Sequence, residues 1–250
     1  MGNHFCVTFS NGQTAAAIKV GKPADLADAL SLIGLEKPHP ILVVVGGASN
    51  ISEESFQAIK KLFVQVLAPL VESLGAFVID GGTDAGVMRL MGEARTEVGA
   101  TFPLIGVAPE EKVMISNYTN VPPDFTPLEP HHTHFVIIPG SNWGDESPWI
   151  AQVASVLADV DPSVTILLNG GEITFCDAFH SVTERRLVMV VAGSGRTADK
   201  LASALRGEPI TDARCRTLAD SGLLQKIDLM DSFDDLTQVL KGLLSKPNHK

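Results

Sequence analysis

The chain has 250 residues, of which 45 % are apolar, so it is long enough for one large α/β domain with a sizeable core. Its formal net charge of −10 excludes a non-specific nucleic-acid binder, because a polyanion would be repelled. A nucleotide stays compatible with this charge, since it needs only local N–H groups and one or two cations.

The cysteines and the absence of long apolar runs indicate where the protein acts. Cys6, Cys176 and Cys215 are odd in number, widely spaced and without a CxxC pair, which favours a reducing cytosol over a disulfide framework. We expect no signal peptide, since no basic region precedes an apolar run at the N-terminus. No apolar run approaches the roughly 18 residues of a spanning helix. These features predict a cytoplasmic protein with no membrane contact.

Strand-like runs and helical periodicity alternate along the chain. Residues 5–9 and 13–20 are typical of a hairpin, and Pro23 begins a short helix. Further strands are expected at 40–45, 76–79, 103–107, 133–138, 164–168, 186–191 and 227–230. Helices are expected from Asn50 or Ser52 to Leu74, at 87–98, at 147–160, through about Glu184, after Gly195 and from Ser232.

This alternation predicts a doubly wound α/β fold, in which a mostly parallel sheet carries helices on both faces. We expect one domain over residues 1–250, with a hairpin and helix in 1–38 and the core in 40–246. Residues 109–132, rich in proline and asparagine, break the pattern and predict a long surface loop. Loops of that length often act as lids or binding loops.

Four of the expected strands are followed directly by a glycine-rich turn. Glycines let a ligand approach the backbone, and the first N–H groups of a following helix point at an anion. Since parallel strands end at one edge of a sheet, the four turns would converge on one crevice. The turn residues expected to contact a ligand are Gly46, Gly47, Ala48, Ser49, Asn50, Asp80, Gly81, Gly82, Thr83, Gly86, Val87, Met88, Gly170, Gly171, Glu172, Thr174, Gly193, Ser194, Gly195 and Arg196.

The ordered motifs resemble the SLOG superfamily, and most closely its branch at the cytosolic N-terminus of melastatin-type TRP channels. The motifs are VVGGA at 44–48, DGGTDAGVM at 80–88, LIGVAP at 104–109, LEPHHTHF at 128–135, GGE at 170–172 and GSGRTAD at 193–199. The resemblance runs from about residue 40 to 240. It implies a Rossmann-like fold and a nucleotide-derived ligand, such as the ADP-ribose or cyclic ADP-ribose bound by the equivalent domain of some channels.

The LOG branch of the same superfamily hydrolyses the N-glycosidic bond of nucleoside monophosphates through a Gly-Gly-x-Gly-Thr-x-x-Glu motif. Here residues 170–177 read GGEITFCD, so Ile173 replaces a glycine and Asp177 replaces the glutamate. The Arg-Lys pair of that branch is also missing upstream. If the chain is an enzyme, Glu172 and Asp177 are the candidate acid/base residues. Otherwise Thr174 and Asp177 form a helix-capping box.

Two side chains outside the glycines have a clear chemical interpretation. Arg196 stands at an expected helix start, where a cation opposes the helix dipole, so a bidentate phosphate contact explains it better. Trp143 follows Ser141 and Asn142 in a turn at a strand end, and all three residues are expected to contact the ligand. Trp143 either stacks on an adenine or packs as a surface aromatic or an oligomer contact. The channel branch carries a tyrosine and an arginine in that segment, which has no arginine here.

Four polar side chains have competing structural roles. Asp84 is expected to cap the following helix, with a ribose contact as the alternative, and Asp80 has the same two interpretations. No metal site is predicted, since no Cys or carboxylate has ligand spacing to His132 and His134. These histidines are expected to form a hydrogen-bonded structural pair, and no cofactor besides the ligand is expected.

The leading expectation is therefore a cytosolic sensor or binding module for a nucleotide-derived ligand. Its diphosphate would lie on N–H groups at 81–86 and 193–196, with ribose and base near 46–50 and 170–174. The alternative is a hydrolase that cleaves an N-glycosidic or phosphate bond of such a ligand. A homo-oligomer is also expected.

Overall fold

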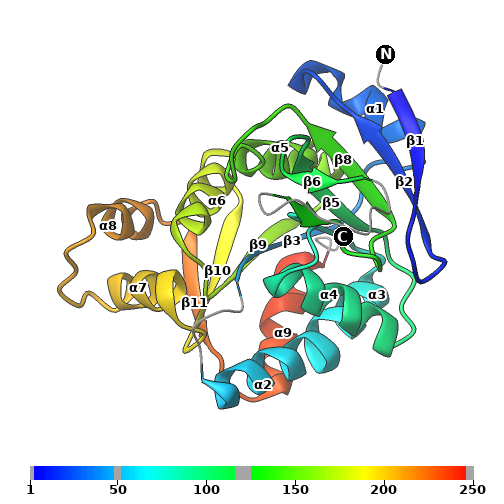
Figure 1. The fold of residues 1–250 in the computed structure, drawn as a ribbon. Coiled ribbons are helices and arrows are strands. Elements are labelled where there is room, and N and C mark those ends of the chain that lie inside the picture. Colours follow the sequence, from blue (N-terminus) through cyan, green and yellow to red (C-terminus); the bar gives the residue numbers. More distant parts are fainter. Residues whose placement is uncertain (1–2, 48–51, 116–124, 246–250) are drawn as a thin grey trace.

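The structure, a computed structural model, describes residues 3–47, 52–115 and 125–245. Nine strands form one twisted sheet, ordered β1-β2-β8-β5-β4-β3-β9-β10-β11, and a separate short pair joins β6 to β7 (Figure 1). The strands are β1 (Asn3–Thr8), β2 (Thr14–Lys19), β3 (Ile41–Gly46), β4 (Phe77–Asp80), β5 (Leu104–Pro109), β6 (Val113–Met114), β7 (Thr126–Pro127), β8 (His134–Ile138), β9 (Ser163–Leu168), β10 (Leu187–Ala192) and β11 (Leu224–Asp228).

All pairings in the large sheet are parallel except the β1–β2 hairpin. The central strands are apolar along their whole length because helices cover both faces. The hairpin continues the same sheet, since β2 runs parallel to β8 at its edge. The doubly wound, mostly parallel sheet predicted from the sequence is thereby confirmed.

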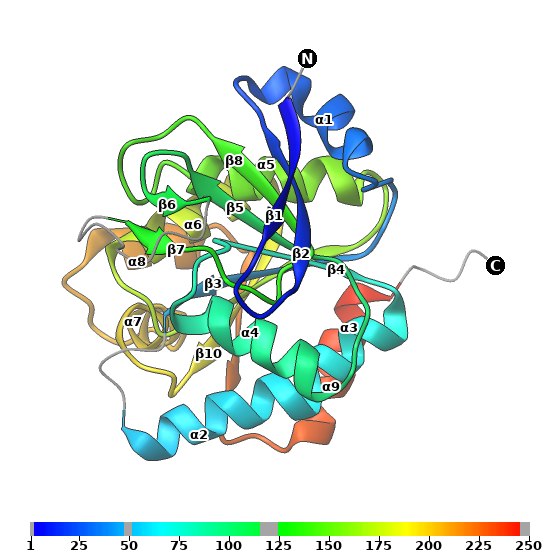
Figure 2. The ribbon, with the colours of Figure 1, turned by 45° about the vertical axis from the view of Figure 1, so that its right-hand side comes forward.

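The helices form one layer on each side of the sheet (Figure 2). The first layer holds α1 (Leu26–Leu32) after a 3₁₀ turn (Pro23–Asp25), α5 (Ser147–Ala158), α6 (Glu172–Thr183), α7 (Arg196–Leu205) and α8 (Ala213–Asp220). The second layer holds α2 (Glu53–Leu62), a π-helical turn (Phe63–Leu67), α3 (Ala68–Leu74), α4 (Gly86–Glu97) and α9 (Phe233–Leu244). Two large apolar cores result, one per face, and a third, smaller cluster lies at the hairpin edge of the sheet.

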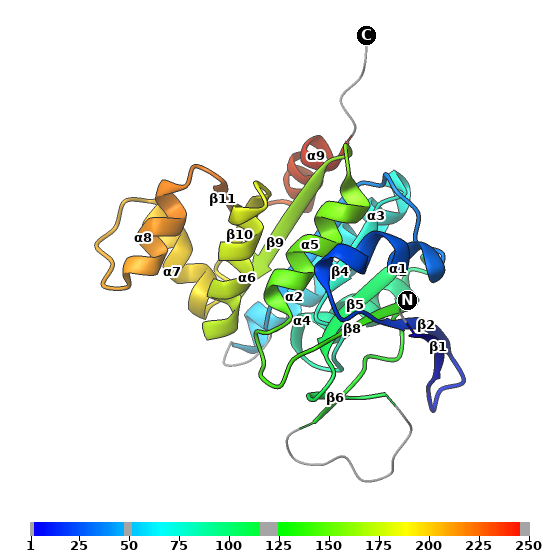
Figure 3. The ribbon, with the colours of Figure 1, turned by 90° about the horizontal axis from the view of Figure 1, so that it is seen from above.

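Three expectations about elements need correction. Helix α8 was not predicted, and Figure 3 shows it at the end of the molecule opposite the hairpin. Strands β6 and β7 pair within residues 109–132, which were expected to form a long surface loop and of which 116–124 lie outside the described residues. The last strand begins at Leu224, three residues before its predicted start. Ser52 and Ser232 cap α2 and α9 as predicted.

Within the described ranges, no helix is both long and apolar enough to cross a membrane.

Candidate functional site

Strand β3 lies between β4 and β9 in the sheet. The chain continues from β3 to its neighbour β4 on one side, and from β9 to its neighbour β10 on the other side. In open parallel sheets the crevice at such a switch point is the usual ligand site. A cavity of about 430 Å³, a volume suited to a small ligand, lies there. Its lining residues are Val44, Val45, Gly46, Gly47, Gly81, Thr83, Met88, Trp143, Glu146, Ile150, Gly171, Glu172, Ile173, Thr174, Asp177 and Arg196.

Gly46 brings the ends of β3 and β9 together at the edge of this cavity. Its φ is 129°, and a Cβ atom there would lie 1.8 Å from the carbonyl oxygen of Leu168. The Gly47 N–H donates to that same oxygen at 3.1 Å. Only glycine allows this approach, so the sequence motif at β3 has a structural cause besides any ligand contact.

The turn after β4 divides into residues that hold it and residues that line the cavity. Asp80 is fully buried and accepts a hydrogen bond from the Gly82 N–H at 2.7 Å. Gly82 itself packs so tightly that a Cβ atom would lie 2.7 Å from the Gly106 Cα. Gly81 and Thr83 line the cavity, whereas Asp80 and Gly82 do not.

The prediction that Asp84 caps α4 was wrong. The N-cap residue is Ala85, and the Asp84 carboxylate instead accepts from the Arg89 Nε at 2.6 Å. In the first turn of α4, Gly86 and the buried Val87 lie outside the cavity lining, while Met88 lies in it.

The N-terminus of α6 lies in the cavity wall. The N–H groups of Gly171, Glu172 and Ile173 find no acceptor among the described residues, as expected for a first helical turn. Such groups favour an anion. Glu172 is exposed and accepts from Arg214 Nη1 at 2.6 Å, and this hydrogen bond lowers the pKa of Glu172 below its ordinary value.

The turn between β10 and α7 differs from the expected phosphate cradle. The N–H groups of Thr197 and Ala198 donate to the carbonyl oxygens of Gly170 (3.4 Å) and Asn169 (3.0 Å), and the Gly193 N–H donates to Asp199 Oδ1 at 2.7 Å. These donors are therefore occupied by the protein.

Ser194 is buried, and its Oγ accepts from the Asn169 N–H at 2.8 Å. Gly170, Gly193, Ser194 and Gly195 join the ends of β9 and β10 and lie outside the cavity lining.

Arg196 is the residue of this turn that reaches the cavity. Its Nη2 lies 2.9 Å from where a Cβ atom of Gly171 would stand, so the guanidinium lies against the start of α6. Its φ of 48° is a backbone conformation that L side chains rarely adopt. Strain of this kind is concentrated at functional sites.

Two buried carboxyl groups face the same cavity. Burial raises the pKa of Asp177 to about 7, and Glu146 adds to this rise although Ser147 Oγ donates to Asp177 Oδ1 at 2.6 Å. Burial likewise raises the pKa of Glu146, whose Oε2 accepts from the Gly144 N–H at 2.7 Å. A carboxyl group whose pKa is raised toward neutral pH is suited to proton transfer.

The capping box predicted for Thr174 and Asp177 does not form. Helix α6 begins at Glu172 after Gly171, so Thr174 already lies inside the first turn and Asp177 lies in the second. The Asp177 carboxyl turns to Ser147 instead of a backbone N–H.

The segment after β8 contributes Trp143, which is 37 % exposed and lines the cavity. The N–H groups of Ser141 and Asn142 both donate to Asp145 Oδ2 at 2.9 Å, and neither residue lines the cavity. Ala48, Ser49 and Asn50 lie outside the described residues.

The described part of the chain holds no group of three or more His, Cys, Asp and Glu side chains arranged to bind a metal ion. The predicted histidine pair is not one pair. His132 bonds to Asp80 and Glu129, and His134 bonds to Thr133 Oγ1 at 2.7 Å.

Sequence reasoning missed Glu146 and Ile150, which α5 and the residue before it bring to the cavity. A possible signal was the carboxylate directly before the Ser147-Pro148 helix start.

A family profile described as "SLOG in TRPM, prokaryote" matches residues 39–238, which include every strand and helix around the cavity. The chain belongs to this family. The family description refers to TRPM channels, and the curated relatives of this chain are channels of that subfamily.

Rat transient receptor potential cation channel subfamily M member 2 is 25 % identical over 234 residues, covering 76 % of this chain and 15 % of the channel. Human transient receptor potential cation channel subfamily M member 6 is 24 % identical over 220 residues, covering 76 % of this chain and 10 % of the channel. The subfamily M member-like 2 channel of Nematostella vectensis is 25 % identical over 201 residues, covering 66 % of this chain and 13 % of the channel. This SLOG chain thus spans a small part of the channels that it matches.

Among solved structures, the X-ray structure of the structural genomics target TM1055 is similar, with a TM-score of 0.52 and 17 % identity. The match covers 81 % of this chain and 98 % of that chain. It supports the Rossmann-like fold.

Proposed function

We propose that this SLOG chain binds a nucleotide-derived ligand, ADP-ribose or a relative, in the cavity at the ends of β3, β4 and β9. The observation that carries the proposal is the convergence there of the Arg196 guanidinium with α6 N–H groups that have no acceptor among the described residues. A phosphate group would accept from both, since helix N-termini and guanidinium groups are complementary to phosphate oxygens.

The rest of the cavity suits a nucleoside. Val45, Met88 and Ile150 supply an apolar wall, and Trp143 offers an aromatic face at the rim on which an adenine would stack. The phosphate position differs from the one expected from sequence. The sequence placed the diphosphate at 81–86 and 193–196. We place the phosphate at the start of α6, because the Gly193 and Ser194 N–H groups already donate to Asp199 Oδ1 and to the Val191 carbonyl oxygen.

Thermal shifts with AMP, ADP-ribose, cyclic ADP-ribose and NAD test the proposal, because a ligand that binds only the folded chain raises its melting temperature. We expect ADP-ribose to raise the melting temperature of the wild-type chain. Arg196→Ala should weaken the interaction about tenfold or more, since a charge-assisted hydrogen bond contributes roughly 1.5–3 kcal/mol.

Arg206→Ala is the matched control for this substitution. It removes the same charge from the other end of α7, where Arg206 is exposed and bonds to Glu208. Equal ADP-ribose affinity in the Arg196 and Arg206 variants would mean that Arg196 does not hold the phosphate.

The two buried carboxyl groups favour a second candidate function, hydrolysis of the N-glycosidic bond of a nucleotide. One protonated carboxyl would donate its proton to the leaving base, and the other carboxylate would accept a proton from the water that attacks the ribose C1′. The raised pKa values of Asp177 and Glu146 suit this division of roles.

Chromatography of AMP and ADP-ribose after incubation with the protein separates the two functions. Recovery of the intact nucleotides supports binding without turnover. Release of free adenine that disappears in Asp177→Asn, while binding persists, would establish hydrolysis.

A further inference from the structure

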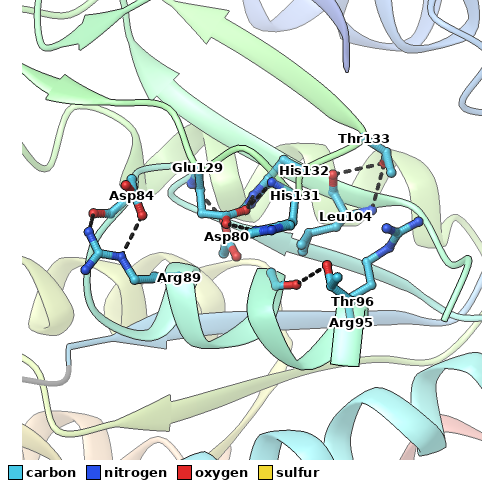
Figure 4. A network of polar contacts seen from close by, with 12 residues as sticks. Asp80, Asp84, Arg89, Arg95, Thr96, Leu104, Glu129, His131, His132 and Thr133 are labelled. Atoms are coloured by element: carbon cyan, nitrogen blue, oxygen red, sulfur yellow. Dashed lines mark hydrogen bonds and ion pairs between the residues drawn. The ribbon is translucent and has the colours of Figure 1, made fainter. Parts of the chain in front are cut away.

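A chain of hydrogen-bonded side chains lies between β4, α4 and the segment before β8 (Figure 4). His132 Nε2 lies 2.8 Å from Asp80 Oδ1, and His132 Nδ1 lies 2.8 Å from Glu129 Oε2. Glu129 Oε1 lies 2.5 Å from the Nδ1 of His131. Asp80, Glu129 and His132 are each at most 1 % exposed.

The ring of His132 lies between two buried carboxylates. Burial alone would lower the pKa of His132, but the carboxylates of Asp80 and Glu129 raise it to about 9. These carboxylates favour the imidazolium form of the ring, in which each ring nitrogen donates to a different carboxylate. Removing the ring leaves two buried carboxylates without their shared partner.

Backbone contacts join the same two segments. The Glu129 N–H donates to the Gly82 carbonyl at 3.0 Å, and the Asp84 N–H donates to the Pro127 carbonyl at 2.8 Å. Thr83 forms an antiparallel bridge with Leu128. The side chains and the backbone thus attach the turn after β4 to residues 127–132.

Helix α4 completes the arrangement. The Glu129 carboxylate fits against Gly92, where a Cβ atom would stand 2.3 Å from Glu129 Oε2. The position of Glu129 is therefore fixed from three sides, by His132, by His131 and by the helix.

We propose that His132 is a positioning residue, which joins Asp80 to Glu129 and thereby keeps Gly81 and Thr83 in the cavity wall. Asp80 is the link, since its Oδ1 faces His132 and also accepts from the Gly82 N–H. His132 does not line the cavity and acts through this turn. Its effect on ligand binding rests on the proposed function.

Amide hydrogen exchange at Gly82 in the ligand-free protein tests the positioning role, because this N–H donates directly to Asp80. In His132→Gln we expect Gly82 to exchange at least about tenfold faster, with little dependence on urea, since the opening is local. Core amides such as those of Val43 and Ile166 should keep their protection.

His134→Gln is the matched control, because it changes a neighbouring partly buried histidine that does not contact Asp80. Gly82 exchange should stay at the wild-type rate in this control. Unchanged Gly82 exchange in His132→Gln would overturn the proposal. So would an acceleration shared equally by the core amides, because that reports a loss of global stability only.

Gly92→Ala provides a second test that changes no charge and applies even if His132→Gln does not fold. The new methyl group displaces the Glu129 carboxylate, and the displacement should reach Gly82 through His132 and Asp80. Faster Gly82 exchange in Gly92→Ala supports the network. Wild-type exchange in a folded Gly92→Ala protein contradicts it.

Calorimetric titration with ADP-ribose measures the consequence for binding. We expect at least a fivefold weaker affinity in His132→Gln and wild-type affinity in His134→Gln. If ADP-ribose fails to bind the wild-type chain, the proposed ligand is wrong, whereas the exchange of Gly82 still decides the role of His132. If both variants bind ADP-ribose equally well, His132 does not position the cavity wall.

Discussion

At the scale of single residues, Asp177 is buried beside the cavity, and its burial lowers the stability of the folded protein by an amount that depends on pH. Its pKa is 3.8 in an unfolded chain and about 7 in the folded protein, so the folded state favours the neutral carboxyl. The stability that the neutral form contributes is complete below pH 3.8 and is lost as the pH rises through about 7.

Asp177→Asn therefore should stabilise the protein at alkaline pH. Relative to wild type, its free energy of unfolding should rise by up to about 4 kcal/mol between pH 4 and pH 8. Urea unfolding at both pH values measures this difference. A constant difference between the two proteins across that range would show that Asp177 is not held in its neutral form.

Residue patterns predicted local features better than long-range pairs. The caps Ser52 and Ser232 and the glycine turns were visible because their signals lie within a few residues. The contact between Asp80 and His132 spans 52 positions, and no local spacing encodes it. The capping box predicted for Thr174 and Asp177 was wrong because it requires α6 to begin after Thr174, whereas α6 begins at Glu172 with Gly171 as its N-cap residue.

At the scale of elements, the start of α6 and the first residue of α7 act together. A methyl group at Gly171 would stand 2.9 Å from Arg196 Nη2, the flexible end of a side chain, so Gly171→Ala should displace the guanidinium without unfolding the protein. We expect ADP-ribose affinity to fall about tenfold and the melting temperature to stay within a few degrees.

Gly242→Ala in α9 is the control for this substitution, because nothing lies within 4 Å of the added methyl group. Wild-type ADP-ribose affinity in Gly171→Ala would contradict the joint phosphate site of α6 and Arg196.

The elements themselves were predicted in proportion to the strength of their periodicity. The buried strands and the long helices were found from apolar runs and stripes. Helix α8 was not predicted because its eight residues bury only Cys215 and Leu218, too few to form an apolar stripe in the sequence. The pair β6–β7 escaped because each strand has two residues.

At the scale of the whole molecule, the nine-stranded sheet places four glycine turns at the ends of the adjacent strands β4, β3, β9 and β10. The turns after β3, β4 and β9 line the cavity, and the turn after β10 contributes Arg196. Strand order was the step that sequence left open, because the sheet is built from long-range pairings. Homo-oligomerisation and a cytoplasmic location stay predictions, and light scattering of the purified chain tests the first.

The most direct test of the central claim is calorimetric titration of the wild-type chain with ADP-ribose at pH 7. The account predicts saturable binding at one site per chain that weakens at least about tenfold in Arg196→Ala and is unchanged in Arg206→Ala. Absence of binding by the folded wild-type chain, or equal affinity in both variants, would contradict it.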